Sequence, residues 1–157
     1  MSYNKQMKKE ILIILTIFLI IFAVFWNKTP KNTENIRKIL KINDVLLNVD
    51  MASTDAERKK GLSGRDGLAE DEGMLFVFDS EGYYGIWMMD MNFPIDIAWL
   101  NKDKKIIYIE SNVVPETFPK GFYAERDGLS ILSLYVLEAK AGFFEKSKIK
   151  IGDSAEF

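Results

Sequence analysis

The sequence predicts a small α+β domain, predominantly β, carried behind one apolar helix. Three observations support this prediction: a charge-free run near the start, many short apolar or alternating runs bounded by turn residues, and only two short stretches with helix signals. We expect one compact six- to seven-stranded sheet or barrel-like domain with two short helices, preceded by one transmembrane helix.

Residues 11–26 read ILIILTIFLIIFAVFW and contain no charge. As a helix they would rise roughly 24 Å, a little less than the roughly 30 Å hydrocarbon core of a bilayer. The flanking lysines Lys8, Lys9 and Lys28 can snorkel to cover the difference, and Trp26 suits an interface. No small-x-small cleavage site follows the run, so we favour an uncleaved anchor over a signal peptide.

This anchor divides the chain into a cytoplasmic tail (1–10), a transmembrane anchor (11–26), a polar tether (27–41) and a β-rich domain (42–157). Basic residues flank both ends of the anchor, so the positive-inside count does not fix its orientation. The short tail favours a signal-anchor. We therefore expect a single-pass membrane protein that contacts membrane lipid through residues 11–26 and places its domain outside the cytoplasm.

The first half of the domain shows strand and helix signals in turn. VLLNVDMA (45–52) alternates as a half-buried strand does. Thr54 with Glu57 fits a capping box, which predicts a short helix that Gly61 and Gly64 end. The following pieces are a buried strand, a turn and a second strand, at 73–78, 79–82 and 83–88.

The second half begins with Pro94, which marks a bend because proline disrupts a regular central strand. After it we expect a strand at 95–100, a hairpin turn at 101–105 and a returning strand at 106–114. A long strand, two helical turns and a terminal strand complete the domain, at 130–139, 141–148 and 149–157.

Composition excludes several kinds of function. The chain has no histidine and no cysteine, which removes His- or Cys-based catalysis, zinc sites and thiol chemistry. Paired carboxylates, a Ser-Lys dyad or carboxylate-bound calcium or magnesium remain. We expect no metal and no cofactor. Residues 31–157 carry 17 Lys and Arg against 22 Asp and Glu, a net charge of −5 without a basic stripe, so we expect no nucleic acid partner.

Motifs spread along the domain resemble one known family. They are Glu57-Arg58 with Gly61-Leu62 and Arg65, Gly73-Met74-Leu75-Phe76 with Phe78, Trp87-Met88, Pro94 with Asp96, Pro115 with Thr117, Leu137-Glu138 with Gly142, and Gly152-Asp153. In this order the chain resembles the domain-of-unknown-function 192 family, a small β-rich domain often carried behind a signal or membrane segment. Ser63 and Met89-Asp90-Met91 depart from its pattern. The resemblance implies a fold and no particular activity.

The segment IWMMDMNFPIDIAWL (86–100) holds the main candidates for a site. One interpretation makes its aromatic and methionine side chains core, with Asp96 fixing a bend through backbone amides or a nearby arginine. The other makes Trp87, Met88 and Tyr83 an apolar shelf in a binding site. Our candidate ligand-binding residues are Arg58, Arg65, Trp87, Met88, Asp96 and Glu138.

Three further arrangements of these charged residues remain open. Arg58 and Glu138 can form a salt bridge between helix and sheet. Asp96 and Glu138 can form a general acid–base pair if they lie roughly 5–10 Å apart. Asp90, Asn92 and Asp96 can hold calcium. We assign no catalytic residue.

Three functions follow. The leading hypothesis is a membrane-anchored binding or accessory domain for a small molecule, glycan or peptide, and we favour this over an enzyme. The rival is a carboxylate-dependent hydrolase or lyase that acts on envelope polymers. The third is a structural partner protein that uses an exposed sheet edge.

Overall fold

The computed structural model describes residues 37–157, together with residues 7, 10–11, 13–18, 20 and 22 of the apolar segment. The chain forms two compact units, Met1–Glu34 and Asn35–Phe157. The described residues of the first unit are helical. No helix built from described residues is long and apolar enough to cross a bilayer. The rest of the predicted tail, anchor and tether lies outside the described residues.

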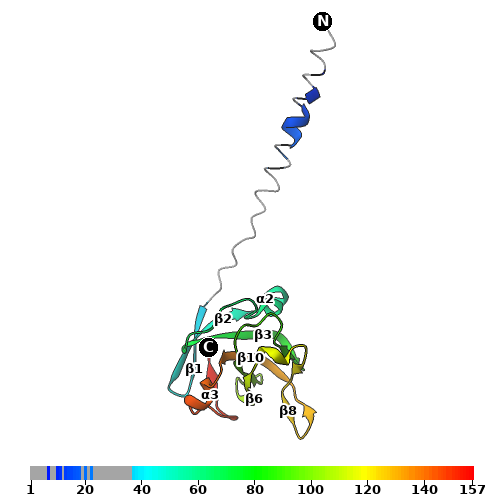
Figure 1. Ribbon diagram of the computed structural model, residues 1–157. Coiled ribbons are helices and arrows are strands. Elements are labelled where there is room, and N and C mark those ends of the chain that lie inside the picture. The colour runs from blue at the N-terminus through cyan, green and yellow to red at the C-terminus, as the bar shows by residue number, and fades with distance from the viewer. Residues whose placement is uncertain (1–6, 8–9, 12, 19, 21, 23–36) are drawn as a thin grey trace. The chain divides into compact units, whose positions relative to one another are not determined.

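The second unit is built on a curled seven-stranded sheet, a half-barrel (Figure 1). Its strand order is β11-β1-β2-β3-β10-β5-β6, and all neighbours are antiparallel except the parallel pair β2 and β3. The strands are β1 Arg37–Ile42, β2 Val45–Ala52, β3 Glu72–Gly82, β5 Ile95–Leu100, β6 Ile106–Val113, β10 Ser133–Lys140 and β11 Ala155–Glu156. The predicted predominantly β fold is confirmed.

Short elements complete the domain. The remaining strands form two pairs, β4 Ile86–Trp87 with β7 Gly121–Phe122, and β8 Glu125–Arg126 with β9 Leu129–Ser130. The helices are α2 Asp55–Lys60, α3 Phe143–Lys146 and a single 3-10 turn, η1, at Pro115–Thr117. Both predicted helices are therefore present, although α3 is one turn long where the sequence suggested two.

The curl of the sheet brings its two edge strands together at one end. Lys105, just before β6, forms an isolated bridge with Ser154, just before β11. The Ile106 amide donates to the Asp153 carbonyl at 2.8 Å, and the Ala155 amide donates to the Lys104 carbonyl at 2.9 Å. These bonds account for the barrel-like character that the sequence predicted.

Two clusters of buried side chains cover the two faces of the sheet, because side chains alternate along a strand. The inner cluster joins strands from both ends of the sheet to α3, through Leu40, Ile106, Leu137, Phe144 and Ala155 among others. Its members span the sheet from β11 to β6, so it fills the inside of the curl. The outer cluster contains Met74, Phe76, Ile97, Trp99 and Val136 among others.

The outer face is covered by the segments that leave the sheet. Parallel strands need a crossover connection, and the one between β2 and β3 carries α2 and the turn after it. Leu62 and Leu68 of this crossover are buried in the outer cluster. The segment around β4 adds Ile86 and Met88. The crossover that carries α2 and the segment around β4 thus both pack on the outer face.

Several element boundaries differ from the predictions. Residues 37–41, expected in the tether, form most of β1, which pairs with β2 along its whole length. Its alternation of buried Leu40 and Ile42 with exposed neighbours is obscured in the sequence by lysine and arginine. The expected turn at 79–82 is instead the end of β3, where Gly82 pairs with Ser133 beside a register shift. Only Ile86–Trp87 of the expected strand 83–88 is strand.

Candidate ligand-binding site

An open cavity of about 130 Å³ lies on the outer face of the sheet, between α2 and β4. The turn after α2 and the aromatic side chains of β3 form its walls, and β10 contributes one residue. Its lining residues are Arg58, Lys59, Lys60, Gly61, Leu62, Ser63, Phe76, Phe78, Tyr84, Gly85, Ile86, Trp87, Met91 and Glu138. Three of the six predicted candidates, Arg58, Trp87 and Glu138, are in this set.

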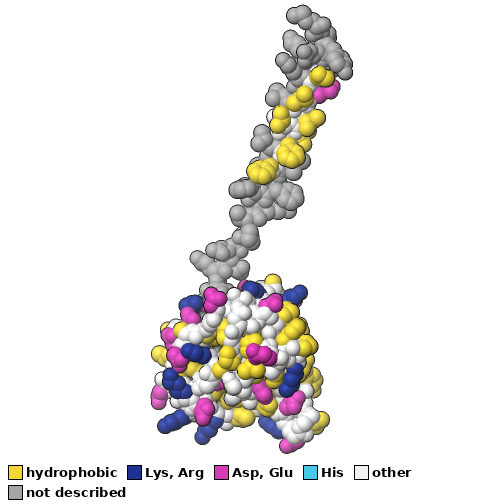
Figure 2. Space-filling view, in the orientation of Figure 1, with side chains coloured by type: hydrophobic (Ala, Val, Ile, Leu, Met, Phe, Trp, Pro, Cys, Tyr) yellow, Lys and Arg dark blue, Asp and Glu magenta, His cyan; other side chains and the backbone are white. Residues whose placement is uncertain are grey.

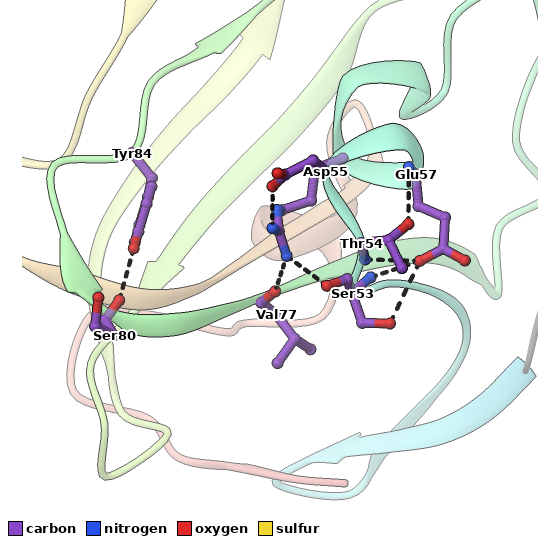
Figure 3. A network of polar contacts seen from close by, with 8 residues as sticks. Ser53, Thr54, Asp55, Glu57, Val77, Ser80 and Tyr84 are labelled. Carbon is purple, nitrogen blue, oxygen red and sulfur yellow. Dashed lines mark hydrogen bonds and ion pairs between the residues drawn. The ribbon is translucent and has the colours of Figure 1, made fainter.

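The start of α2 is held by the predicted capping box (Figure 3). The Glu57 amide donates to Thr54 Oγ1 at 3.2 Å, and the Glu57 carboxylate accepts from the Ser53 and Thr54 amides at 2.9 Å each. These backbone hydrogen bonds lower the pKa of the Glu57 carboxyl. Because α2 has only six residues, this cap matters for fixing the helix that forms one wall of the cavity.

Arg58 ties α2 to β3. Its Nη1 donates to the Ser53 carbonyl at 2.6 Å and to the Val77 carbonyl at 2.8 Å, and its Nη2 pairs with Asp55. The guanidinium also lies over the Phe78 ring, 5.1 Å from its centroid. The predicted salt bridge between Arg58 and Glu138 is therefore wrong, although both residues line the same cavity.

An aromatic stack forms the wall beside Arg58. The ring centroids of Phe78 and Tyr84 are 3.4 Å apart, and the ring planes are nearly parallel, with an angle of 7° between them. The Tyr84 hydroxyl donates to the Ser80 carbonyl at 2.6 Å (Figure 3). Trp99 Nε1 donates to the Tyr84 carbonyl at 2.8 Å. These two hydrogen bonds fix Tyr84 at its hydroxyl and at its backbone carbonyl. Tyr83, which the sequence placed in the shelf, does not line the cavity.

Trp87 and Met88 have opposite environments although they are neighbours. Trp87 is 53% exposed and lines the cavity, whereas Met88 is buried in the outer cluster. For Met88 the core interpretation was correct. For Trp87 the binding interpretation fits its position better, because a large aromatic side chain half-exposed at a cavity is an available contact surface.

Glu138 is the buried polar group of the cavity. It lies on β10 between Met74 of β3 and Ile97 of β5, and only 5% of it is exposed. Its Oε2 has no hydrogen-bond partner among the described residues. Burial raises the pKa of this carboxyl to about 8, and the charge of Arg65 opposes the rise. Glu138 is therefore mostly protonated and uncharged at pH 7.

Arg65 belongs to a separate ion pair at the edge of this face. Its Nη2 lies 2.8 Å from Oδ2 of Asp50, and Arg37 Nε lies 3.0 Å from Oδ1 of the same carboxylate. Asp50 is buried, and both of its oxygens are paired. Asp50 was not among the candidate residues predicted from the sequence. Arg65 is not one of the residues that line the cavity.

Asp96 lies on the other face of the sheet. It is fully buried, its Oδ1 accepts from the Asn112 amide at 2.8 Å, and its Oδ2 accepts from the Phe144 amide at 3.2 Å. In the register Asp96 is opposite Ala139, so Asp96 and Glu138 project from opposite faces. Asp96 thus has the structural role that one interpretation gave it, with different backbone donors from those expected.

This placement contradicts two arrangements that used Asp96. A general acid–base pair of Asp96 and Glu138 would need both carboxyl groups on one side of the sheet. Calcium binding by Asp90, Asn92 and Asp96 would need an accessible Asp96 carboxylate, whereas this carboxylate is fully buried and accepts a backbone amide on each oxygen. Within residues 37–157 and the described part of the apolar segment, no group of three or more acidic, histidine or cysteine side chains could hold a metal.

Several residues of the motifs found in the sequence line the cavity, among them Arg58, Phe76 and Trp87. A model of the family described as uncharacterized ACR matches residues 38–157. The chain belongs to the DUF192 family. The resemblance inferred from the motifs is confirmed, and the matched range begins inside β1.

Two solved structures resemble this DUF192 domain. A candidate transcription regulator from Sinorhizobium meliloti 1021 has 25% sequence identity and a TM-score of 0.71, covering 80% of this chain and 96% of that chain. A protein of unknown function from Novosphingobium aromaticivorans DSM 12444 has 27% identity and a TM-score of 0.70, covering 77% of this chain and 85% of the other. None of the curated proteins compared with the chain matches it.

Several cavity residues of this DUF192 domain were not among the site candidates predicted from the sequence. They are Lys59, Lys60, Phe76, Phe78 and Met91. Two signals could have found four of them. Arg58-Lys59-Lys60 is a run of cations directly before the glycine that ends α2, and Phe76 and Phe78 share one face of a strand. Met91 lies in an irregular segment that no periodicity describes.

Proposed function

We propose that this DUF192 domain is a binding module that takes one apolar group of a small molecule or peptide into the cavity between α2 and β4. One observation carries the proposal: the buried residue Glu138 lines an open cavity, and its Oε2 has no hydrogen-bond partner among the described residues. Leaving a buried polar atom unpaired costs about 1–3 kcal/mol. A ligand that hydrogen-bonds to Glu138 would recover part of this free energy.

The size and lining of the cavity favour a single compact group. Its volume of about 130 Å³ is close to that of an engineered apolar cavity of about 150 Å³ that binds benzene. Cavities that hold whole drug-sized molecules measure about 300–1,000 Å³. Phe76, Trp87 and Met91 give the lining an apolar surface. This surface favours an aromatic ring or a branched aliphatic group over a sugar ring.

The arrangement favours binding over hydrolysis and over regulation of transcription. The hydrolase hypothesis lacks its carboxylate pair, because Asp96 and Glu138 are on opposite faces. Regulation of transcription, suggested by the name of the Sinorhizobium meliloti protein, would need a basic surface for DNA. Side chains of both signs are interspersed on the face seen in Figure 2, and residues 31–157 carry a net charge of −5. We propose that the domain binds no nucleic acid.

The ligand proposal is tested by NMR screening of single-ring fragments against the protein. We expect backbone amide shifts that cluster at Gly61, Trp87 and Glu138. Trp87→Ala should weaken binding about 5- to 30-fold, because an aromatic contact of this kind contributes roughly 1–2 kcal/mol. Tyr83→Ala is the matched control, since Tyr83 is similarly exposed but outside the lining. Fragments that bind only elsewhere, or not at all, would overturn the proposal.

We also propose that residues 11–26 anchor the chain in a membrane with the domain outside the cytoplasm. The support is the charge-free composition of this run and the separate compactness of Asn35–Phe157. The full chain should sediment with membranes and dissolve only with detergent. Deleting residues 1–27 should give soluble protein with a packed near-UV circular dichroism spectrum. Truncated protein that still sediments with membranes, or that lacks the near-UV spectrum, would contradict this layout.

A further inference from the structure

We infer that the ligand of this cavity is an organic anion, an apolar carboxylate whose ring or chain contacts Phe76 and Trp87 and whose charge is met by Lys59 and Lys60. The inference rests on the proposed binding function and adds the chemical class of the ligand. It is carried by the distribution of charge around the cavity and by the position of Glu138.

The charges that line the cavity are almost all positive. Arg58, Lys59 and Lys60 contribute three cations, and Glu138 is the only acidic residue in the lining. This local excess is opposite in sign to the net charge of −5 over residues 31–157. Because focused charge in a concave site raises the local concentration of the opposite ion, the cavity attracts anions although the whole domain does not.

The two lysines are the cations available to a ligand. Arg58 is already paired with Asp55 and bonded to two backbone carbonyls. Lys59 and Lys60 are both exposed, and among the described residues neither forms an ion pair. Lys60 Nζ donates only to the Ser63 carbonyl, at 2.6 Å. Their positive charges are therefore not compensated by neighbouring carboxylates.

Glu138 favours an anion over a cation for a second reason. A protonated carboxyl donates a hydrogen bond to a ligand oxygen and gives no ion pair to an amine. The other charged groups around it are the three cavity cations and Arg65, whose own partner is Asp50. These cations together would make an added cation costly in the same space.

The lysines also border a second, shallower hollow of about 360 Å³, lined by Ala56, Lys59, Lys60, Ser63, Met89 and Asp90. A ligand longer than one ring can therefore extend past the lysines along the surface. The carboxylate can come from a free organic acid or from the end of a polypeptide chain. Both sources share the chemistry inferred here, and the experiment distinguishes them.

The test compares three single-ring probes, benzoate, benzamide and benzylammonium, by NMR titration of the full chain in detergent micelles at pH 6.5. We expect benzoate to bind about tenfold more tightly than benzylammonium, since two exposed cations together contribute roughly 1 kcal/mol or a little more. Lys59→Gln with Lys60→Gln should remove this preference, and should weaken the binding of benzoate more than that of benzamide. Lys38→Gln with Lys102→Gln, which changes the net charge equally at exposed sites outside the lining, should preserve it.

Two further arms complete the test. Raising the pH from 6.5 to 9 should weaken benzoate binding to the wild-type protein several-fold, as Glu138 ionises, and should not weaken binding to Glu138→Gln.

The second arm identifies the source of the carboxylate. Acetyl-glycyl-phenylalanine with a free carboxylate is compared with its amide. Tighter binding of this acid than of 3-phenylpropionate identifies a polypeptide terminus, and equal binding identifies a free acid.

The outcomes separate the inference from the proposed function. Benzylammonium binding as tightly as benzoate in the cavity would overturn the anionic class and leave the binding function standing. Binding by none of the three probes would remove the binding function, and the inference with it. The lysine pair lies on the exposed rim, so the test does not depend on whether Glu138→Gln folds normally.

Discussion

Replacing Asp96 by alanine should lower the free energy of unfolding by about 4 kcal/mol. The carboxylate is fully buried and accepts one backbone hydrogen bond on each oxygen, from Asn112 and from Phe144. Without it both amides lose their acceptor inside the protein, and each such loss costs about 1–3 kcal/mol. The loss of the carboxylate also leaves a cavity, which adds to the cost.

This large effect reflects what Asp96 connects. Phe144 lies in the first turn of α3, and Asn112 is near the end of β6 in a left-handed conformation with φ 53°. The carboxylate therefore joins β5 to a strand and to a helix that follows it by 48 residues in sequence. Asp96→Asn should lie between wild type and Asp96→Ala, because the amide keeps one acceptor oxygen and presents N–H to a donor.

Urea unfolding at pH 7, followed by circular dichroism, measures the effect. Asp103→Ala is the matched control, since Asp103 is exposed in the hairpin between β5 and β6, and it should change the free energy of unfolding by less than about 0.5 kcal/mol. A loss below about 1 kcal/mol for Asp96→Ala would show that the two amides find other acceptors.

The stability of the domain should fall as the pH rises from 5 to 9, because of Glu138. In the folded protein the pKa of this carboxyl is about 8, against 4.5 for an unperturbed glutamate, since burial disfavours its ionised form. Between these values the folded state holds a proton that the unfolded state has released. Stability is therefore complete below about pH 4.5 and decreases with each pH unit up to about 8.

The size of this dependence follows from the same linkage. Each pH unit between the two pKa values changes the free energy of unfolding by about 1.4 kcal/mol, so the loss from pH 5 to pH 9 should reach about 4 kcal/mol. The pKa values of Glu57, Glu70 and Asp153 are lowered instead. These three carboxyls stay ionised between pH 5 and pH 9, so they do not add to the change in the free energy of unfolding with pH.

Urea unfolding at intervals of one pH unit tests the prediction. Glu138→Gln cannot ionise and should give a nearly flat profile that crosses that of wild type. Above pH 8 the variant should be the more stable protein. Glu145→Gln, at an exposed position in α3, should follow the wild-type slope. A wild-type profile as flat as that of Glu138→Gln would mean that water or a nearby cation stabilises the ionised form.

The fold was predictable where a single strand or turn carries its own pattern. The alternation of 45–52 and the pair Thr54 and Glu57 predicted β2 and the start of α2, because both depend on neighbours in sequence. No such alternation marks RKILKI as β1, because the exposed Ile39 stands next to the buried Leu40 and breaks the pattern. The end of β3 escaped prediction because its pairing with Ser133 depends on a register shift in another strand.

The candidate site was predictable in its residues and less so in their grouping. Arg58, Trp87 and Glu138 do line one cavity, but Asp96 was grouped with Glu138. The register places Ala139 rather than Glu138 opposite Asp96, and a shift of one residue reverses the face of a side chain. That register is set by long-range pairing. The cation–carboxylate pair of Arg65 and Asp50 likewise joins β2 to a distant part of the crossover that follows it.

The pairing of β11 with β1 has a consequence for the order of folding. Ala155 and Glu156 pair with Ile42 and Lys41, so the first strand of the sheet takes its second neighbour from the last residues of the chain. Contacts of such long sequence separation raise the contact order and slow folding. During synthesis β1 therefore keeps one edge uncovered until Ala155 and Glu156 have been made and can pair with it.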